Sequence, residues 1–240
     1  KNAFLLTATS LILRTVGIFF RVYLSNKIGA EGMGLYQLVF SVYILASTFA
    51  ISGISTGVTR LIAEQAGQVT RNGVRRVMWR AIALSVIFGL LSALIIISCA
   101  EYIARYALGD MRAVPALQIL SAGLPFMGVS SCIRGYFIAR RRVSDSMGAQ
   151  LFEQFVRITV IVLIINKFAS KGIGMACAAV MVGDALAQIL SCGYIAVSYI
   201  LDKRKLPTVA KGSGKTYSRI LRKLLTISLP VSAGRYVNTA

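Results

Sequence analysis

The sequence predicts an all-α integral membrane protein, built as a polytopic helix bundle. Hydrophobic residues make up 56% of the 240 residues, more than is usual for a soluble domain. Short polar connections separate apolar runs of about bilayer-spanning length, and lipid favours helices because they satisfy their own backbone. The runs cover residues 4–24, 35–63, 77–99, 115–138, 149–166 and 173–200, with a partial seventh at 220–240.

These runs predict a domain order. Residues 1–201 form an N-terminal transmembrane lobe of six helices, 202–219 a basic cytoplasmic linker, and 220–240 the start of helix seven and of a truncated second lobe. The chain opens on Lys1 and stops inside an apolar segment. We therefore expect it to be part of a longer, transporter-sized polypeptide.

The net charge of +19 would suggest nucleic acid in a soluble protein. Here most basic residues lie in short loops between the apolar runs, and the loops that follow the even-numbered helices hold more of them than the other loops do. The positive-inside rule then places the N-terminus and these loops in the cytoplasm, in a bacterial cell membrane, and no nucleic-acid partner is expected. The absence of histidine excludes imidazole ligands and histidine-based catalysis. No metal, cofactor or enzymatic activity is predicted.

Helix one carries arginines where a spanning helix should be apolar. Arg14 lies near its midpoint, where an arginine costs roughly 2.5–3.5 kcal/mol on insertion scales. Arg21 follows two turns later and could instead reach the headgroups. A sector about 80° wide gathers the polar residues of this helix: Thr7, Ser10, Arg14, Gly17, Arg21 and Ser25. The pattern predicts a wet, basic surface inside the protein.

Helix two repeats the pattern with small polar residues. A sector about 60° wide holds Gln37, Ser41, Thr48, Ser52, Ser55 and Thr59. Tight helix packing and the lining of a hydrated cavity both explain it, and the neighbouring basic stripe favours the cavity. Arg60 lies off this stripe near the cytoplasmic end, where snorkelling is the default.

Helix four has a small-residue face that predicts close packing, with Arg134 turned away from it and Pro125 expected to kink the helix. In helix five, Glu153 and Arg157 have the favourable i,i+4 spacing of an internal ion pair. Asp184 of helix six either pairs with an arginine of another helix or binds an ion or proton.

Cations outnumber acids on these segments. Glu153 and Asp184 stand against six arginines: Arg14, Arg21, Arg60, Arg134, Arg157 and Arg235. A surplus of guanidinium groups favours an anionic passenger, because the guanidinium fork binds phosphate through two hydrogen bonds.

Several segments also carry a family resemblance: ArgThrValGly (14–17), IleGlyAlaGluGlyMetGlyLeuTyrGln (28–37), ThrArgLeuIleAlaGlu (59–64), GluGlnPheValArg (153–157) and LeuPro…GlyArgTyrValAsn (229–238). With them the chain resembles the stage V sporulation protein B-like polysaccharide exporters. These belong to the multidrug/oligosaccharidyl-lipid/polysaccharide (MOP) superfamily, which includes lipid II flippases. The resemblance implies two helix bundles around a central cavity that work by alternating access.

In lipid II flippases, two arginines on the first helix line a cationic cavity for pyrophosphate, and Arg14 and Arg21 are similar by position. Ser55 stands where relatives usually have a proline, which bears on the bending of helix two. A substrate cavity is thus expected to include Arg14, Arg21, Gln37, Ser41, Thr48, Ser52, Arg60 and Arg235.

Three functions remain open at this point. The first is a flippase for an undecaprenyl-pyrophosphate-linked saccharide or peptidoglycan precursor, with membrane lipids as its surroundings. The second is a cation-coupled multidrug antiporter in which Asp184 and Glu153 bind the coupling ion. The third is a non-transporting scaffold for an envelope or glycan synthase. The basic interior favours the first, since a scaffold has no need of buried arginines.

Overall fold

The computed structural model describes residues 2–51, 53–64, 71–168 and 172–204. Within these ranges every regular element is helical, which confirms the predicted all-α class. The elements are α1 (Asn2–Ile51), α2 (Ile54–Glu64), α3 (Arg71–Tyr102), the π-helix η1 (Ile103–Leu108), α4 (Ala113–Ser121), α5 (Leu124–Ala139), α6 (Val143–Phe168) and α7 (Ile173–Arg204).

Four helical segments are long and apolar enough to cross a membrane: Thr7–Thr48, Gly73–Leu108, Val143–Asn166 and Ile173–Arg204. The pair α4 and α5, bent by 40°, makes a fifth if it forms one span. The protein is therefore a multi-pass membrane protein. The expected start of helix seven and most of the linker lie outside the described residues.

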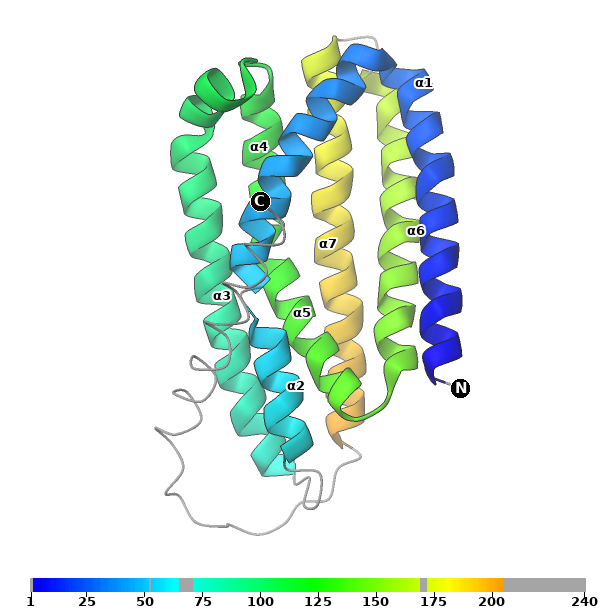
Figure 1. Ribbon diagram of the computed structural model, residues 1–240, viewed down its shortest axis with the longest axis vertical. Coiled ribbons are helices and arrows are strands. Elements are labelled where there is room, and N and C mark those ends of the chain that lie inside the picture. Colours follow the sequence, from blue (N-terminus) through cyan, green and yellow to red (C-terminus); the bar gives the residue numbers. More distant parts are fainter. Residues whose placement is uncertain (1, 52, 65–70, 169–171, 205–240) are drawn as a thin grey trace.

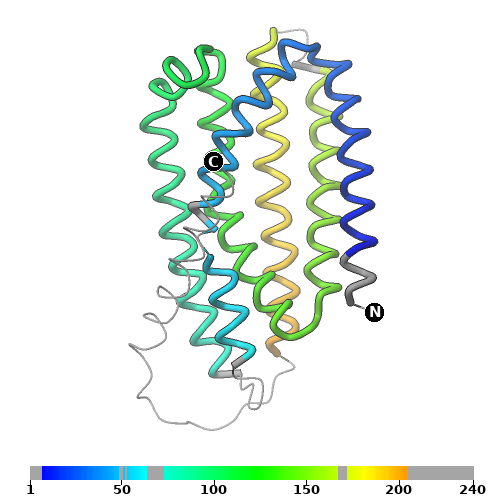
Figure 2. The backbone as a smooth tube through the Cα atoms, viewed as in Figure 1, coloured from blue at the N-terminus to red at the C-terminus, as the bar shows by residue number. Residues whose placement is uncertain are grey.

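The first two apolar runs share α1, which turns over at Gly29, where φ is 73° and ψ is 175°. Figure 1 shows α1 running along one side of the bundle, bending at one end and returning across the front toward α2. The later helices run back and forth beside it, and Figure 2 shows the same path of the chain.

Helix two is not continuous, contrary to the predicted run 35–63. The helix ends at Ile51, and a new one begins at Ile54 after Gly53, whose φ of 64° leaves the helical region. Such a φ is natural for glycine and strained for other residues. The predicted stripe is therefore split, because Ser55 and Thr59 belong to a different helix from Gln37 and Ser41.

The predicted helix four is interrupted as well, but the break is not the kink expected at Pro125. Helix α4 ends at Ser121, and Pro125 lies in the first turn of the next helix, α5. Proline is tolerated there because that N–H has no helical partner to lose. The bend thus precedes the proline.

The small-residue face of α5 packs closely on α2. A Cβ added to Gly135 would lie 2.6 Å from the backbone oxygen of Ser55, and the hydroxyl of Thr59 donates to the carbonyl of Gly135 at 3.0 Å. At this end of helix two, the small polar residues therefore serve packing.

Basic residues gather at one end of the bundle. Figure 1 places the N-terminus, the α5–α6 connection and the end of α7 at the same end, opposite the turn in α1. The α5–α6 connection carries Arg140, Arg141 and Arg142, and α7 ends on Lys203 and Arg204. The connections that the sequence analysis found to be rich in basic residues therefore lie at one end of the bundle.

Candidate functional site

The arginines of helix one lie on an open flank of α1. Arg14 and Arg21 are both exposed, and on a helical wheel they lie about 60–80° from the buried Leu24. Leu24 belongs to the contact with α6 and α7. A Cβ built on Gly17, which lies between the two arginines, meets no atom within 4 Å. The space beside this flank is therefore open in the lobe.

Neither arginine is neutralised by the part of the chain that the structure describes. Among the described residues, no carboxylate lies within ion-pair distance of Arg14 or Arg21. Arg21 lies within electrostatic range of Tyr36 on the returning half of α1. We call Arg14, Gly17 and Arg21 the basic flank.

The polar residues of helix two lie on the outer side of α1. Gln37 and Ser41 are exposed and Thr48 is half-buried. Val39, on the opposite side of the same helix, is fully buried in the bundle. The hydroxyls of Ser41 and Thr48 donate to carbonyls of their own helix at 2.8 and 2.9 Å. Side chains satisfied in this way suit lipid as well as water.

The remaining cavity candidates are less informative. Arg60 is exposed on α2, away from the basic flank in the chain. Ser52 and Arg235 lie outside the described residues. Arg14 and Arg21 are therefore the exposed cations of α1 around which we argue a site.

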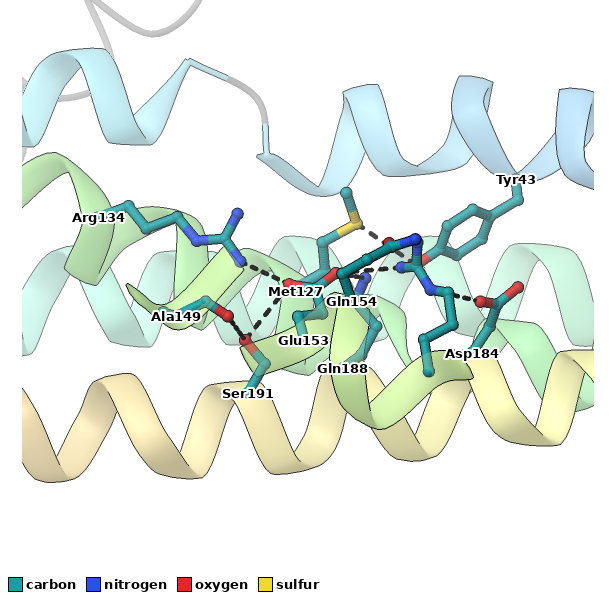
Figure 3. Close-up of polar contacts among 10 residues, drawn as sticks. Tyr43, Met127, Arg134, Ala149, Glu153, Gln154, Asp184, Gln188 and Ser191 are labelled. Carbon is teal, nitrogen blue, oxygen red and sulfur yellow. Dashed lines mark hydrogen bonds and ion pairs between the residues drawn. The ribbon is translucent and has the colours of Figure 1, made fainter. Parts of the chain in front are cut away.

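A second group of charges is buried between α5, α6 and α7. Its centre is Glu153, whose carboxylate accepts four hydrogen bonds (Figure 3). One oxygen accepts from Arg157 at 3.1 Å and from Gln188 at 3.0 Å. The other accepts from Arg134 at 2.7 Å and from Ser191 at 3.3 Å. The i,i+4 pair expected from the sequence is therefore one edge of a larger network.

Arg157 connects this centre to Asp184. Its Nε lies 2.7 Å from Oδ1 of Asp184, although the N–H does not point along that line and forms no hydrogen bond. Asp184 is only 4% exposed. The acid on helix six is thus paired with an arginine of another helix, the first of the two alternatives that its position left open.

The network changes the charge balance expected from the sequence. Arg134 was expected to face away from the packed side of its helix and was counted as a surplus cation, but it reaches Glu153 on α6. Two guanidinium groups and two carboxylates therefore cancel in the interior. We call Arg134, Glu153, Arg157 and Asp184 the buried network. Arg14 and Arg21, by contrast, are exposed.

Two further ion clusters were missed by the sequence analysis. Asp202 of α7 accepts hydrogen bonds from Tyr136 at 2.5 Å and Arg140 at 2.6 Å, and also contacts Arg142. The sequence feature that could have revealed this cluster is that Asp202 is a lone acid among basic residues. At the opposite end, Arg112 contacts Glu31 and Asp110, each at 2.8 Å.

The inventory of reactive groups is sparse. Within the described ranges, no group of three or more cysteine, aspartate or glutamate side chains could hold a metal ion. Cys132, Cys177 and Cys192 are buried free thiols, and Cys99 is an exposed one.

Comparison with known proteins places this geometry in a family. Stage V sporulation protein B of Bacillus subtilis is 25% identical over 99% of this chain and 46% of its own length. The lipid II flippase MurJ of the same organism is 21% identical over 96% of this chain and 45% of its own length. The chain thus spans about half the length of the curated relatives it matches.

Solved structures agree on the fold. A MATE transporter in complex with MaD3S superposes with a TM-score of 0.74 at 18% identity, over 94% of this chain and 50% of that one. A MOP superfamily transporter from Pyrococcus furiosus, described as having a binding pocket of reverse polarity, superposes with a TM-score of 0.75 at 18% identity, over 97% of this chain and 52% of that one.

The model of the polysaccharide biosynthesis protein family matches residues 1–240. Because this match covers the whole length of the chain, the protein belongs to the polysaccharide biosynthesis protein family.

Proposed function

We propose that this chain is part of a flippase that moves an undecaprenyl-pyrophosphate-linked saccharide or peptidoglycan precursor across the bacterial cell membrane by alternating access. One observation carries the proposal. Arg14 and Arg21 lie exposed on one flank without a carboxylate among the described residues, whereas the buried arginines are neutralised. Two guanidinium groups on the same flank can each bind a phosphate through two hydrogen bonds.

The lipid tail needs no site of its own in this scheme, because it stays in the bilayer while the charged headgroup crosses. The exposed mid-helix position of Arg14 is costly in lipid, by roughly 2.5–3.5 kcal/mol. Water and an anion on that flank would remove this cost. The arginines therefore suit a path for a charged headgroup, and no covalent chemistry is required.

The relatives support the proposal by their names. One matched relative is a lipid II flippase and another is a stage V sporulation protein. A glycan or envelope synthase that uses the translocated precursor is the expected partner. We place the N-terminus and the basic end of the bundle in the cytoplasm, where the precursor would be loaded.

The test is complementation of a flippase-deficient strain, with the membrane level of each variant measured. Arg14→Ala should insert at least as well as the wild type, yet lose flipping about 10- to 150-fold, the range for a lost hydrogen bond to a charged group. Arg14→Lys should recover only part, because an ammonium lacks the fork. Arg105→Ala, an exposed arginine of η1, serves as the matched control.

Full activity of a well-expressed Arg14→Ala protein would contradict this mechanism. The second candidate, a cation-coupled multidrug antiporter, would then gain. It is favoured by the buried Asp184, one oxygen of which has no hydrogen-bond partner within the described part of the chain. Drug efflux that depends on a sodium or proton gradient, and is lost in Asp184→Asn, would establish it. Loss of synthase assembly with flipping intact would instead indicate a scaffold.

A further inference from the structure

The buried network contains the groups that could bind a cation, and the positive charge among them is an arginine side chain. Glu153 and Asp184 present carboxylate oxygens from α6 and α7, and Arg157 lies in contact with both, at 3.1 and 2.7 Å. Gln188 and Ser191 add polar groups from α7. A monovalent cation bound by a protein needs oxygen ligands of this kind.

The charge count is the second step. Arg134 and Arg157 supply two positive charges, and Glu153 and Asp184 supply two negative ones. Asp184 and Glu153 are 4% and 13% exposed, and an uncompensated charge in such surroundings is strongly unfavourable. The network is therefore closed to a further cation as long as Arg157 occupies it.

Two atoms show that the contact between Arg157 and Asp184 leaves hydrogen-bonding groups unused. Oδ2 of Asp184 is buried and has no hydrogen-bond partner within the described residues, and the Nε of Arg157 forms none either. Buried polar atoms are normally hydrogen-bonded. An oxygen left open beside the guanidinium is a ligand that a smaller, mobile cation could use.

We propose that Arg157 is a tethered cation: its guanidinium fills a latent monovalent-cation site formed by Glu153 and Asp184, so this lobe needs no mobile ion there. Removing the guanidinium leaves one net negative charge. A sodium ion, a potassium ion or a proton would then neutralise it. This inference goes beyond the proposed function, because it concerns what occupies the interior of the lobe and holds for any substrate.

The groups that face Asp184 determine whether another positive charge could replace that of Arg157. Tyr36 and Tyr43 approach from α1, and a phenol carries no positive charge in either of its protonation states. Glu153 and Arg157 approach from α6. Among the charged groups of the described residues, Arg157 is the one in direct contact with Asp184, so no described group replaces its charge there.

The experiment compares thermal unfolding of the full protein in detergent, in sodium, potassium or N-methylglucamine chloride at one ionic strength, at pH 8 and pH 6. The wild-type midpoint should be the same in all three salts. Arg157→Met should unfold at a lower temperature in N-methylglucamine at pH 8. It should regain about 5 °C in saturating sodium or potassium, or at pH 6, as expected for a ligand near 100 times its Kd.

Three further variants complete the design. Arg157→Lys keeps a tethered charge and should remain indifferent to the salt. Adding Asp184→Asn to Arg157→Met removes the surplus charge and should abolish the response. Arg105→Met, outside the network, should behave as the wild type. If Arg157→Met does not fold, the wild type still tests the inference, because saturable stabilisation of the wild type by sodium or potassium would overturn it.

Two results would overturn the inference. The first is a saturable sodium or potassium stabilisation of the wild type that Asp184→Asn removes, since a mobile ion would then bind with Arg157 in place. The second is a folded Arg157→Met protein that responds to neither cation nor pH, since the two carboxylates would then form no latent site. Neither result depends on whether the protein flips a lipid.

Discussion

The basic flank of α1 and the buried network contain the same residue type in opposite roles. Arg14 and Arg21 are exposed and lack a carboxylate within the described chain. Arg134 and Arg157 lie between α5, α6 and α7, where Glu153 and Asp184 neutralise them. The difference teaches that an arginine on a membrane helix indicates function only once its partners are known. A neutralised arginine stabilises the fold, and an unpaired one is available to a ligand.

Replacing Glu153 should give the largest loss of stability. Glu153→Ala removes four hydrogen bonds and leaves two guanidinium groups without their shared carboxylate. Breaking a buried ion pair by removing one partner costs roughly 3–5 kcal/mol. We expect a correspondingly lower midpoint in denaturant or heat, together with a lower membrane level.

The control is Glu101→Ala, an exposed acid at the end of α3, which should unfold as the wild type does. Arg14→Ala should also keep its stability while losing transport. If Glu153→Ala were as stable as Glu101→Ala, the distinction between a structural and an available set of arginines would fail.

An intermediate effect is expected at Asp202, which is as buried as Asp184 but lies at the basic end of the bundle. Asp202→Asn keeps the shape and weakens its contacts with Tyr136, Arg140 and Arg142. Hydrogen bonds to charged groups contribute roughly 1.5–3 kcal/mol each, and half-exposed arginines recover part of that through water. We expect a loss of about 1–3 kcal/mol, measured as a shift in unfolding midpoint.

This prediction sharpens the comparison, because here the arginines have both a carboxylate and access to water. Asp145→Asn, which removes a contact of Arg142 at 3.0 Å, is the matched variant with a smaller expected shift. A loss at Asp202 equal to that at Glu153 would show that burial of the acid alone sets the magnitude.

The smallest effect is expected at the exposed end, where Arg112 contacts Asp110. Hydrogen bonds from the Arg112 side chain lower the pKa of Asp110. This ion pair therefore stabilises the folded protein at pH values above the unfolded pKa of about 3.9. The stabilisation is lost as the pH falls through the lower pKa of the folded state. Exposed pairs contribute little.

Asp110→Asn should thus unfold slightly earlier than the wild type at pH 7. The difference should begin to shrink as the pH falls below about 4 and should vanish once the pH is below the folded pKa of Asp110. High salt should reduce it at every pH, because exposed charges are screened. A large or salt-independent difference would mean that this end of the bundle contributes more than a surface ion pair.

The sequence by itself determined the class of this protein and the existence of its charged helices. Apolar runs of bilayer length require helices, since lipid offers no partner for an unpaired backbone. Periodicity was sufficient to place Arg14 and Arg21 on one side of α1 and to predict that Glu153 and Arg157 meet within α6, because both relations lie within one helix.

Only the tertiary structure decided the partners between helices. Arg134 belongs to α5 and its carboxylate to α6, and no spacing within either helix encodes that contact. The same holds for the choice of Arg157 as the partner of Asp184. The break at Gly53 was also beyond the sequence pattern, because a glycine in an apolar run is compatible with a continuous helix until packing against α5 selects the interrupted one.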